Sequence, residues 1–258
     1  MKEQLIHYTE CPVCGSATIQ QVLEAKDYTV SQRLFAVWEC GQCSLRFTQD
    51  VPDQASIGPY YKSEDYISHT NTSKGLVNNL YQKVRNYTLG VKRRLVSRQT
   101  GLQKGALLDL GCGTGAFVNE MQMNGWIVTG LEPDADARKV GAELFGVQLQ
   151  STDRFYSLEK GQFDAITLWH VLEHVHELHA YIDQLKALLK EKGKLFIAVP
   201  NYTSRDAGVY KKHWAAYDVP RHLYHFSPSS IDKLMQLHGM KVEAYKPMWF
   251  DSLQHAEP

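Results

Sequence analysis

The chain has 258 residues, of which 43% are hydrophobic and 22% charged, and this length suits one full domain with a small appendage. Its 28 basic residues balance 28 acidic ones, so the charge indicates no preference for nucleic acid or an anionic membrane. No apolar run approaches the roughly 18 residues of a spanning helix, and the N-terminus lacks a signal-peptide core. We therefore expect a cytoplasmic protein with no membrane span and no nucleic-acid partner.

Four of the five cysteines form two C-x-x-C pairs, Cys11 with Cys14 and Cys40 with Cys43, within residues 1–48. Each pair can direct two thiolates at one tetrahedral ion, and a metal would stabilise a segment too short for its own core. The stretch between the pairs has room for two short strands. The pattern predicts a zinc-ribbon-like segment with a structural Zn²⁺ site, with free thiols or a redox pair as the alternative.

Residues 49–104 are predicted to form a linker, a tyrosine-rich turn and a long helix. The turn covers Tyr60–Tyr66, and its tyrosines form either a lid over a ligand or ordinary core. The helix covers about Lys74–Arg98, because its apolar residues recur at helical spacing along one face.

Residues 105–258 alternate between strand-like and helix-like stretches. The predicted strands are Leu107–Leu110, Ile127–Glu132, Val147–Gln150, Phe163–Leu168, Leu195–Val199 and Lys241–Lys246. The predicted helices lie near residues 116–124, 134–145, 177–190 and 229–238. This alternation predicts an α/β, Rossmann-like fold with a mostly parallel sheet, helices on both faces, and ligands at the carboxyl ends of the strands.

A three-glycine turn follows the first predicted strand of this region, with Gly111, Gly113 and Gly115 directly after Leu107–Leu110. Glycine lets the backbone turn tightly against a ligand, and this spacing also fits a dinucleotide-binding loop. Asp109 distinguishes the two, since a carboxylate at the strand end would repel a pyrophosphate. A cofactor carrying positive charge, such as S-adenosylmethionine with its sulfonium and ammonium groups, is favoured instead.

Glu132 lies about 20 residues after the glycine turn, at the end of the second predicted strand. A carboxylate at that place can accept hydrogen bonds from both vicinal hydroxyls of a ribose. Glu132 is therefore a second candidate for cofactor binding.

Four motifs extend this pattern over about residues 105–250. They are Leu-Asp109-Leu-Gly111-Cys-Gly113-Thr-Gly115, Gly130-Leu-Glu132-Pro-Asp134, Phe163-Asp164-Ala-Ile-Thr-Leu-Trp169-His170-Val-Leu-Glu173-His174-Val and Gly193-Lys-Leu-Phe-Ile-Ala-Val-Pro200-Asn201. In this order they resemble the class I S-adenosylmethionine-dependent methyltransferases, and in particular bacterial members with a Val-Leu-Glu-His-Val segment after the fourth strand. The resemblance implies a methyltransferase fold and activity.

The resemblance also implies roles for individual residues. Asp109 and the glycine turn would hold the methionine part of S-adenosylmethionine. Asp134 and Thr152 would lie near the adenosine, and Trp169 and His170 would border both the cofactor and the methyl acceptor.

The C-terminus departs from this family. Its fold adds a seventh, antiparallel strand, but Pro247–Pro258 is too short and too polar for a hairpin partner. We expect an incomplete sheet whose edge is exposed or covered by a partner.

His170, Glu173 and His174 match H-x-x-E-H, a zinc-protease signature that requires one long helix. Here His170 directly follows a predicted strand, so a metalloprotease is disfavoured. Helix-start packing is the leading interpretation, and a metal site of Glu173 and His174 that assists methyl transfer is the alternative.

The segment His213–Ser227 is rich in histidine and aromatic residues, which is typical of a pocket wall. Histidine suits removal of a proton from an acceptor near neutral pH. Sugar C-methyltransferases with an N-terminal zinc domain have a similar segment, and this similarity implies His222 as first choice of base and His225 as second. Tyr217 or Tyr224 would assist, whereas a stacked wall without proton transfer remains the alternative.

Together these patterns predict an S-adenosylmethionine-dependent methyltransferase acting on a small molecule such as a sugar, polyketide-type or quinone-like metabolite. The alternatives are a dinucleotide-dependent oxidoreductase, disfavoured by Asp109, and a non-catalytic interaction protein with a vestigial cofactor fold. The sequence leaves open which atom is methylated and whether the chain forms a homodimer.

Overall fold

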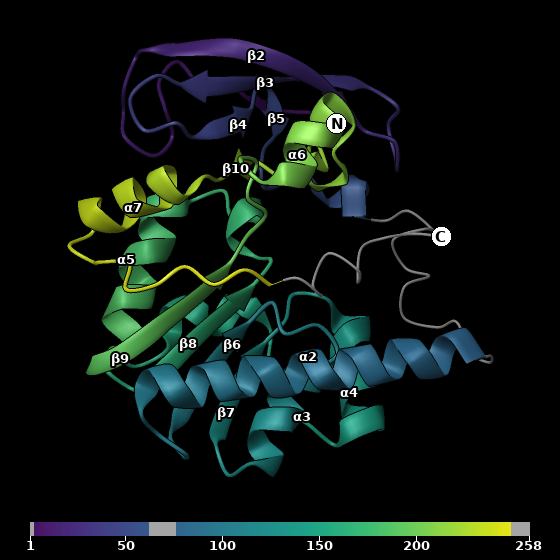
Figure 1. Cartoon of the computed structure of the whole chain (residues 1–258), viewed down its shortest axis with the longest axis vertical. Helices are drawn as coiled ribbons and strands as arrows, with labels where there is room; N and C mark the ends of the chain where they lie inside the picture. Colours follow the sequence, from purple (N-terminus) through teal and green to yellow (C-terminus); the bar gives the residue numbers. More distant parts are fainter. Residues whose placement is uncertain (1–2, 62–75, 249–258) are drawn as a thin grey trace. The chain divides into compact units, whose positions relative to one another are not determined.

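The computed structural model describes residues 3–61 and 76–248, with side chains from residue 84 onward in the helix that begins at Leu76. The chain divides into two compact units (Figure 1). What we call the antiparallel unit comprises the described parts of 1–72, 172–181 and 199–245, and what we call the parallel-sheet unit comprises those of 73–171, 182–198 and 246–258. Since the units interleave along the chain, the boundaries that the sequence predicts after residues 48 and 104 stay predictions.

The antiparallel unit contains two sheets. The strands are β1 (Leu5–Ile6), β2 (Ile19–Lys26), β3 (Leu34–Cys40), β4 (Arg46–Thr48), β5 (Val51–Pro52) and β10 (Tyr224–His225). The larger sheet has the order β10-β4-β3-β2, and β1 pairs with β5. Strand β10 lies in the histidine-rich segment, and its Tyr224 is opposite Phe47 of β4. This pairing ties the segment to strands near the N-terminus.

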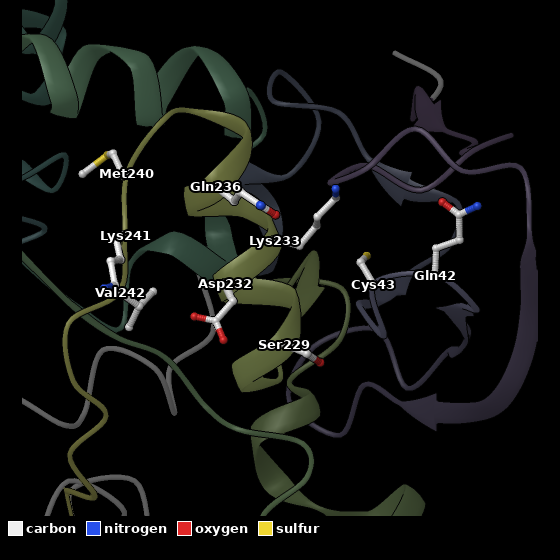
Figure 2. A pocket seen from close by; sticks show the side chains of 9 residues that line it. All are labelled: Gln42, Cys43, Ser229, Asp232, Lys233, Gln236, Met240, Lys241 and Val242. Atoms are coloured by element: carbon white, nitrogen blue, oxygen red, sulfur yellow. The ribbon is translucent and has the colours of Figure 1, made fainter.

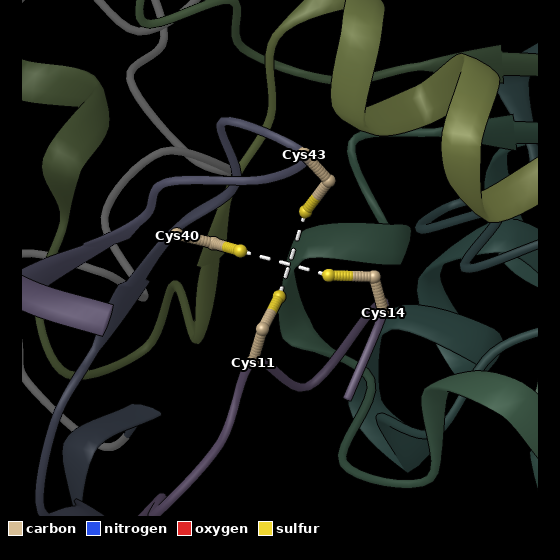
Figure 3. Close-up of side chains that lie close together, drawn as sticks. All are labelled: Cys11, Cys14, Cys40 and Cys43. Carbon is tan, nitrogen blue, oxygen red and sulfur yellow. Dashed lines mark hydrogen bonds between the residues drawn. The ribbon is translucent and has the colours of Figure 1, made fainter. Parts of the chain in front are cut away.

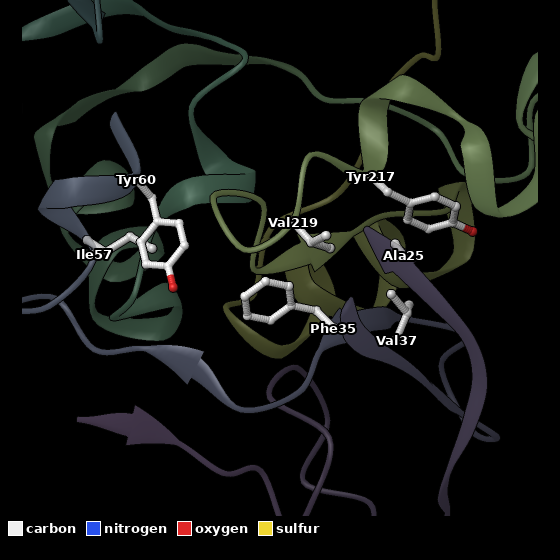
Figure 4. Packing of buried hydrophobic residues seen from close by; sticks show 7 residues of the cluster. All are labelled: Ala25, Phe35, Val37, Ile57, Tyr60, Tyr217 and Val219. Atoms are coloured by element: carbon white, nitrogen blue, oxygen red, sulfur yellow. The ribbon is translucent and has the colours of Figure 1, made fainter. Parts of the chain in front are cut away.

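The core of this unit forms between β2, β3 and the segment around residue 217 (Figure 4). Strand β3 alternates, so that Phe35 and Val37 turn inward, as expected for a half-buried strand. Tyr217 and Val219 pack against them at 3% and 0% exposure. The apolar residues of β3 thus position part of the histidine-rich segment.

Helical segments complete the antiparallel unit. They are η1 (Gly58–Tyr61), η3 (Leu172–His174), α6 (Arg205–Tyr210), η4 (Lys211–His213), η5 (Ala215–Tyr217) and α7 (Pro228–Leu237). Helix α7 begins as the sequence suggests, because Ser227 and Ser230 form a reciprocal capping box and Pro228 occupies the first turn.

The parallel-sheet unit contains a four-stranded sheet of order β7-β6-β8-β9, with every neighbouring pair parallel. The strands are β6 (Ala106–Leu110), β7 (Ile127–Leu131), β8 (Phe163–Trp169) and β9 (Leu189–Ala198). The helical segments are α2 (Leu76–Thr100), α3 (Ala116–Met123), α4 (Ala135–Phe145) and η2 (Thr152–Ser157), while α5 (Leu178–Leu188) has residues in both units. This is the α/β fold predicted from the sequence.

The two central strands of this sheet, β6 and β8, are largely apolar and buried along most of their length. Leu107, Leu108, Ile166 and Leu168 are each 0% exposed, as expected for parallel strands covered on both faces. Helices α2 and α3 pack together over one part of the sheet, and Phe117 and Met121 of α3 lie in its core. The helix predicted at about Lys74–Arg98 is confirmed as α2, although Tyr87, an apolar-face position at helical spacing, is 56% exposed.

Two predicted strands are wrong. Val147–Gln150 forms only an isolated parallel bridge between Gln150 and Leu131, because its backbone bonds to β7 are confined to Gln150, which donates to the Gly130 carbonyl and accepts from Glu132 N–H. Lys241–Lys246 has no regular structure, since five of its six residues are exposed and it has no apolar face to bury.

Within the described residues the parallel sheet has four strands, and it is not the complete seven-stranded sheet of the family fold. Residues 249–258, most of the C-terminal segment that the sequence predicts to lack a seventh strand, lie outside the described part of the chain, as do residues 62–66 of the tyrosine-rich turn. No helix in the described part is long and apolar enough to span a bilayer.

Candidate functional site

The three glycines of the turn after β6 have two different structural roles, since two are required by packing and one leaves open space. All three are left-handed, with φ of 62° at Gly111, 54° at Gly113 and 74° at Gly115. A Cβ atom would lie 2.6 Å from Val171 at Gly111 and 2.9 Å from Val147 at Gly115, but would meet nothing within 4 Å at Gly113. The outer glycines are therefore required by packing, whereas the middle one faces open space in which a ligand can approach the backbone.

Asp109 is enclosed at the carboxyl end of β6, with 1% exposure. Its Oδ1 accepts a hydrogen bond of 2.6 Å from the hydroxyl of Thr167 on the neighbouring strand β8. Burial raises the pKa of Asp109 to about 7, and the charge of Glu132 adds to this, while the Thr167 bond and the charge of Lys92 oppose it. A cationic ligand beside this carboxyl group would favour its ionised form.

Glu132 directly follows β7 and is 8% exposed. Its Oε2 accepts the backbone N–H of Gly113 at 2.7 Å, and its Oε1 accepts that of Asp134 at 3.0 Å. Burial raises the pKa of Glu132, although both hydrogen bonds lower it. The bond to Gly113, which the sequence did not reveal, fixes the glycine turn against the end of β7 and leaves further lone pairs for hydroxyl groups.

Asp134 and Thr152 lie beside this region with simpler structural roles. Asp134 is the N-cap of α4, and its carboxylate accepts the N–H groups of Asp136 at 2.8 Å and Ala137 at 3.3 Å. Thr152 is the first residue of η2. Their predicted contacts with adenosine stay predictions.

Trp169 and His170 end strand β8. The Trp169 ring packs edge-on against Phe117, with centroids 5.5 Å apart, and Lys92 Nζ lies 4.7 Å from its centroid. His170 has a φ of 60°, and the next helical segment, Leu172–His174, is a single 3₁₀ turn. The long helix that a zinc protease of this signature requires is therefore absent between these residues.

The three predicted catalytic residues lie in different environments. His222 is 9% exposed, and its Nδ1 is 2.9 Å from the Ala216 carbonyl oxygen. His225 is 2% exposed beside the Thr48 hydroxyl, and burial holds its pKa well below the usual range. Tyr217 is 3% exposed, and its hydroxyl accepts a bond of 2.9 Å from Arg46. The role of each stays a prediction, and only His222 presents a ring nitrogen to the cluster described next.

Glu173, His174 and His222 come together in the antiparallel unit, with one ligand atom of each within 4.8 Å of the others. Two contacts join the turn Leu172–His174 to the segment that carries His222. Leu223 N–H donates to the Glu173 carbonyl at 2.8 Å, and His174 Nδ1 lies 3.0 Å from the Arg221 carbonyl oxygen. Burial lowers the pKa of His174 to about 4; the charge of His222 acts in the same direction and that of Glu173 opposes it. The sequence pattern identified Glu173 and His174, but His222 joins them only through the fold.

The four cysteines of the two C-x-x-C pairs converge from two loops of the antiparallel unit (Figure 3). The Sγ atoms of Cys11 and Cys43 are 3.5 Å apart, and those of Cys14 and Cys40 are 3.6 Å apart. A tetrahedral zinc ion with bonds of about 2.3 Å separates its sulfur ligands by about 3.8 Å. The geometry therefore fits a single Zn²⁺ ion with small adjustments.

Backbone N–H groups also face each of these sulfur atoms. The residue two positions after each cysteine supplies one, and these residues are Val13, Ser16, Gln42 and Leu45. The bond from Gln42 to the Cys40 sulfur is 3.4 Å long. Donors repeated in this way stabilise negative charge on sulfur, and the hydrogen bond from Cys43 lowers the pKa of Cys11 to about 5. The site is suited to thiolates.

A shallow hollow of about 650 Å³ lies beside this cluster (Figure 2). It is lined mainly by α7 and the chain after it, and Cys43 forms part of its wall. Its lining includes Asp232, Lys233 and Lys241 but no histidine and no residue of the glycine turn. We therefore assign it no part in the candidate site.

Comparison with known families matches residues 81–245 to the model described as "Methyltransferase domain". Among curated proteins, the chain is 35% identical over 119 residues to the ubiquinone biosynthesis O-methyltransferase of Glaesserella parasuis serovar 5, covering 42% of this chain and 50% of that protein. It is 32% identical over 146 residues to the enzyme of the same name from Xanthomonas oryzae pv. oryzae, covering 53% and 61%. The matches thus span half to about three fifths of the relatives' length.

Solved structures show the same fold. The magnesium protoporphyrin IX methyltransferase of Synechocystis PCC 6803 is 18% identical with a TM-score of 0.55, covering 74% of this chain and 91% of that one. The 1,6-didemethyltoxoflavin-N1-methyltransferase of Burkholderia thailandensis is 15% identical with a TM-score of 0.51, covering 83% and 87%. At such low identity the likeness concerns the fold alone.

Proposed function

Because the chain belongs to the family of S-adenosylmethionine-dependent methyltransferase domains, we propose that it transfers a methyl group from S-adenosylmethionine to a small-molecule acceptor. S-adenosylmethionine supplies a methyl group already activated by its sulfonium, so the protein's main tasks are to orient the two substrates and to receive a proton.

The observation that carries this proposal is the pair of buried carboxyl groups beside an open glycine. Asp109 and Glu132 end neighbouring parallel strands, and Gly113, which donates to Glu132, faces free space. Asp109 would hold the cationic methionine part of the cofactor, and Glu132 would accept the ribose hydroxyls. A pyrophosphate would instead meet two carboxyl groups, which disfavours a dinucleotide.

Methyl transfer can be tested directly with radiolabelled S-adenosylmethionine and a panel of quinone-like phenols, sugar nucleotides and polyketide-type compounds. We expect labelled product with at least one class, and none when Asp109 and Glu132 are both replaced by Ala. Product formation that survives the double replacement would exclude this cofactor site.

For the acceptor, the support is the activity of the relatives, which are O-methyltransferases of ubiquinone biosynthesis. We therefore rank quinone-like phenols first, and sugars and polyketide-type metabolites after them. Competition between these classes in one labelled assay would reveal the preferred acceptor.

His222 is the residue that we propose to act in acceptor deprotonation. It is the least enclosed of the three predicted catalytic side chains, and the bond at Nδ1 leaves Nε2 available to take a proton. His222→Asn should lower kcat about 100-fold or more while S-adenosylhomocysteine binding is unchanged. His213→Asn is the matched control from the same segment, and an equal loss in both variants would remove His222 from the mechanism.

We also propose that the four-cysteine site holds a structural Zn²⁺ ion. The sulfur spacing, the four backbone donors and the burial of three of the four cysteines support this assignment. Elemental analysis of the full-length chain should find one zinc bound by thiolates, and a zinc-free but folded chain would contradict it.

A further inference from the structure

We propose that Glu173, His174 and His222 form a second metal site, which binds one divalent transition-metal ion with two imidazoles and one carboxylate. This site is distinct from the four-cysteine site and lies wholly within the antiparallel unit. Binding of the ion does not depend on the proposed function. Any role of the ion in methyl transfer does rest on the proposed function.

The orientation of the two imidazole rings supports this site. Each ring places Nδ1 next to a backbone carbonyl oxygen, that of Arg221 for His174 and that of Ala216 for His222. An Nδ1–H that donates to a carbonyl leaves Nε2 as a lone-pair donor, the tautomer by which histidine binds metals. The two rings meet edge to face with centroids 4.6 Å apart, and one ligand nitrogen of each lies within 4.8 Å of the other, close enough for both to bind one ion.

Glu173 supplies the third ligand from the 3₁₀ turn Leu172–His174, where its side chain is 0% exposed. Carboxylate oxygens are common ligands of divalent transition-metal ions, and an ion between Glu173 and the two imidazoles would place its charge next to this buried side chain. The ligand atoms all lie within 4.8 Å of one another, an upper limit that includes the separation of about 3.4 Å set by metal–ligand bonds of about 2.0–2.2 Å.

Asp218 is positioned beside the cluster but is held by another partner. Its Oδ2 lies 3.8 Å from His222 Nε2, while the Arg221 guanidinium donates to both of its oxygens at 3.0 Å. Because Arg221 neutralises Asp218, we assign the ligand set to Glu173 and the two histidines. Three protein ligands leave at least one coordination position open, as in metal sites that bind a substrate oxygen.

The type of ligand selects the type of metal. Two imidazoles and a carboxylate suit Zn²⁺, Co²⁺, Fe²⁺ or Mn²⁺, whereas the four-thiolate site prefers zinc. Cobalt can therefore report on the new site in a chain whose cysteines already hold zinc, because thiolate-bound cobalt gives intense charge-transfer absorption and imidazole-carboxylate cobalt does not.

The test uses the full-length chain with one equivalent of zinc, titrated with Co²⁺ and followed by visible absorption and calorimetry. We expect one further equivalent to bind without thiolate bands. Glu173→Gln and His222→Asn should each raise the Kd for Co²⁺ at least about 100-fold. The controls Glu177→Gln and His213→Asn, which change exposed side chains of the same unit, should leave it unchanged.

Three results would overturn the proposal: no cobalt beyond the zinc equivalent, thiolate bands that show exchange at the cysteines, or a second equivalent that is lost in His179→Asn. The last would place the ion at the exposed pair of His179 and His238, whose ring nitrogens are 2.8 Å apart. The wild-type stoichiometry and spectrum remain decisive even if a variant does not fold.

S-adenosylhomocysteine binding, measured on the same samples, separates this proposal from the proposed function. A chain that binds cobalt but no S-adenosylhomocysteine would refute the function and keep the metal site. If both bind, loss of methyl transfer in His222→Asn together with cobalt would make His222 a metal ligand in place of the free base proposed above. Loss of methyl transfer without a change in cobalt affinity would make His222 a base and, as a fourth contrary result, would overturn the proposed ligand set.

Discussion

The two units of the molecule are stabilised by different means. In the parallel-sheet unit, the apolar residues of the two central strands from Leu107 to Leu110 and from Ala165 to Leu168 are 0–1% exposed, and the buried carboxyl groups of Asp109 and Glu132 lie near the carboxyl ends of β6 and β7. In the antiparallel unit, β2 has one buried residue among eight, and two clusters of metal-ligating side chains lie between short strands and turns. The first unit can rely on its hydrophobic core, whereas the second, with its smaller core, would gain additional stability from the ions that we propose it binds.

The largest effect should come from removing zinc. Chelation, or Cys11→Ser with Cys40→Ser, should destabilise the antiparallel unit by several kcal/mol. Hydrogen exchange followed by mass spectrometry should then show faster exchange in β2 to β4 and unchanged protection in β6 to β8. An equal increase in exchange rate in both sheets would mean that the two units do not differ in their dependence on zinc.

The next effect concerns the pH dependence of the parallel-sheet unit. The pKa of Asp109 is raised to about 7 in the folded chain, from an ordinary value of 3.8. A carboxyl group with a raised pKa favours folding when protonated, so this contribution is complete below about pH 4 and is lost as the pH rises through about 7. Asp109→Asn should reduce the fall in unfolding free energy between pH 5 and pH 8 by about 2 kcal/mol or more in urea titrations, and identical pH profiles would contradict the assignment.

A third prediction concerns Glu132, whose carboxylate combines backbone and ligand contacts. Glu132→Gln should weaken S-adenosylhomocysteine binding about 10- to 100-fold, because charge-assisted hydrogen bonds contribute roughly 1.5–3 kcal/mol. Calorimetry provides the measurement. Glu120→Gln, which changes a carboxylate paired with Arg93 on the α3 side of the same unit, is the control and should bind normally.

The smallest expected effects come from replacing glycines of the glycine turn, where one glycine is required by packing and another leaves space for a ligand. Gly111→Ala should lower stability by about 1–3 kcal/mol, because its Cβ would lie 2.6 Å from Val171 at a positive φ. Gly113→Ala should have a smaller effect on stability but a larger one on S-adenosylhomocysteine binding, since its Cβ enters open space. Melting curves with and without S-adenosylhomocysteine should show that Gly111→Ala loses more stability and Gly113→Ala loses more ligand binding. If one variant is the more damaging for both stability and binding, the assignment is refuted.

The sequence predicts the parallel-sheet unit well because its signals are local. The apolar run of β6, Asp109 and the glycine turn are contiguous, and Glu132 follows at a fixed interval. The four cysteines were likewise identified by spacing alone, and they do converge. Periodicity failed at Lys241–Lys246, where a strand-like pattern has no apolar face to bury.

The histidine cluster could be predicted only in part. Glu173 and His174 are neighbours in the chain, but His222 reaches them because β10 pairs with β4 and Leu223 bonds to the Glu173 carbonyl. Such long-range pairing leaves no local pattern. The same holds for His225 and Tyr217, whose burial depends on strands near the N-terminus rather than on their own segment.

Calorimetric titration of the full-length chain with S-adenosylmethionine, S-adenosylhomocysteine and NAD tests the central claim most directly. The structure predicts that the first two bind at one site per chain, that this binding is lost when Asp109 and Glu132 are both replaced by Ala, and that NAD does not bind. Binding of NAD without either adenosyl ligand, or adenosyl binding that survives the double replacement, would contradict the account.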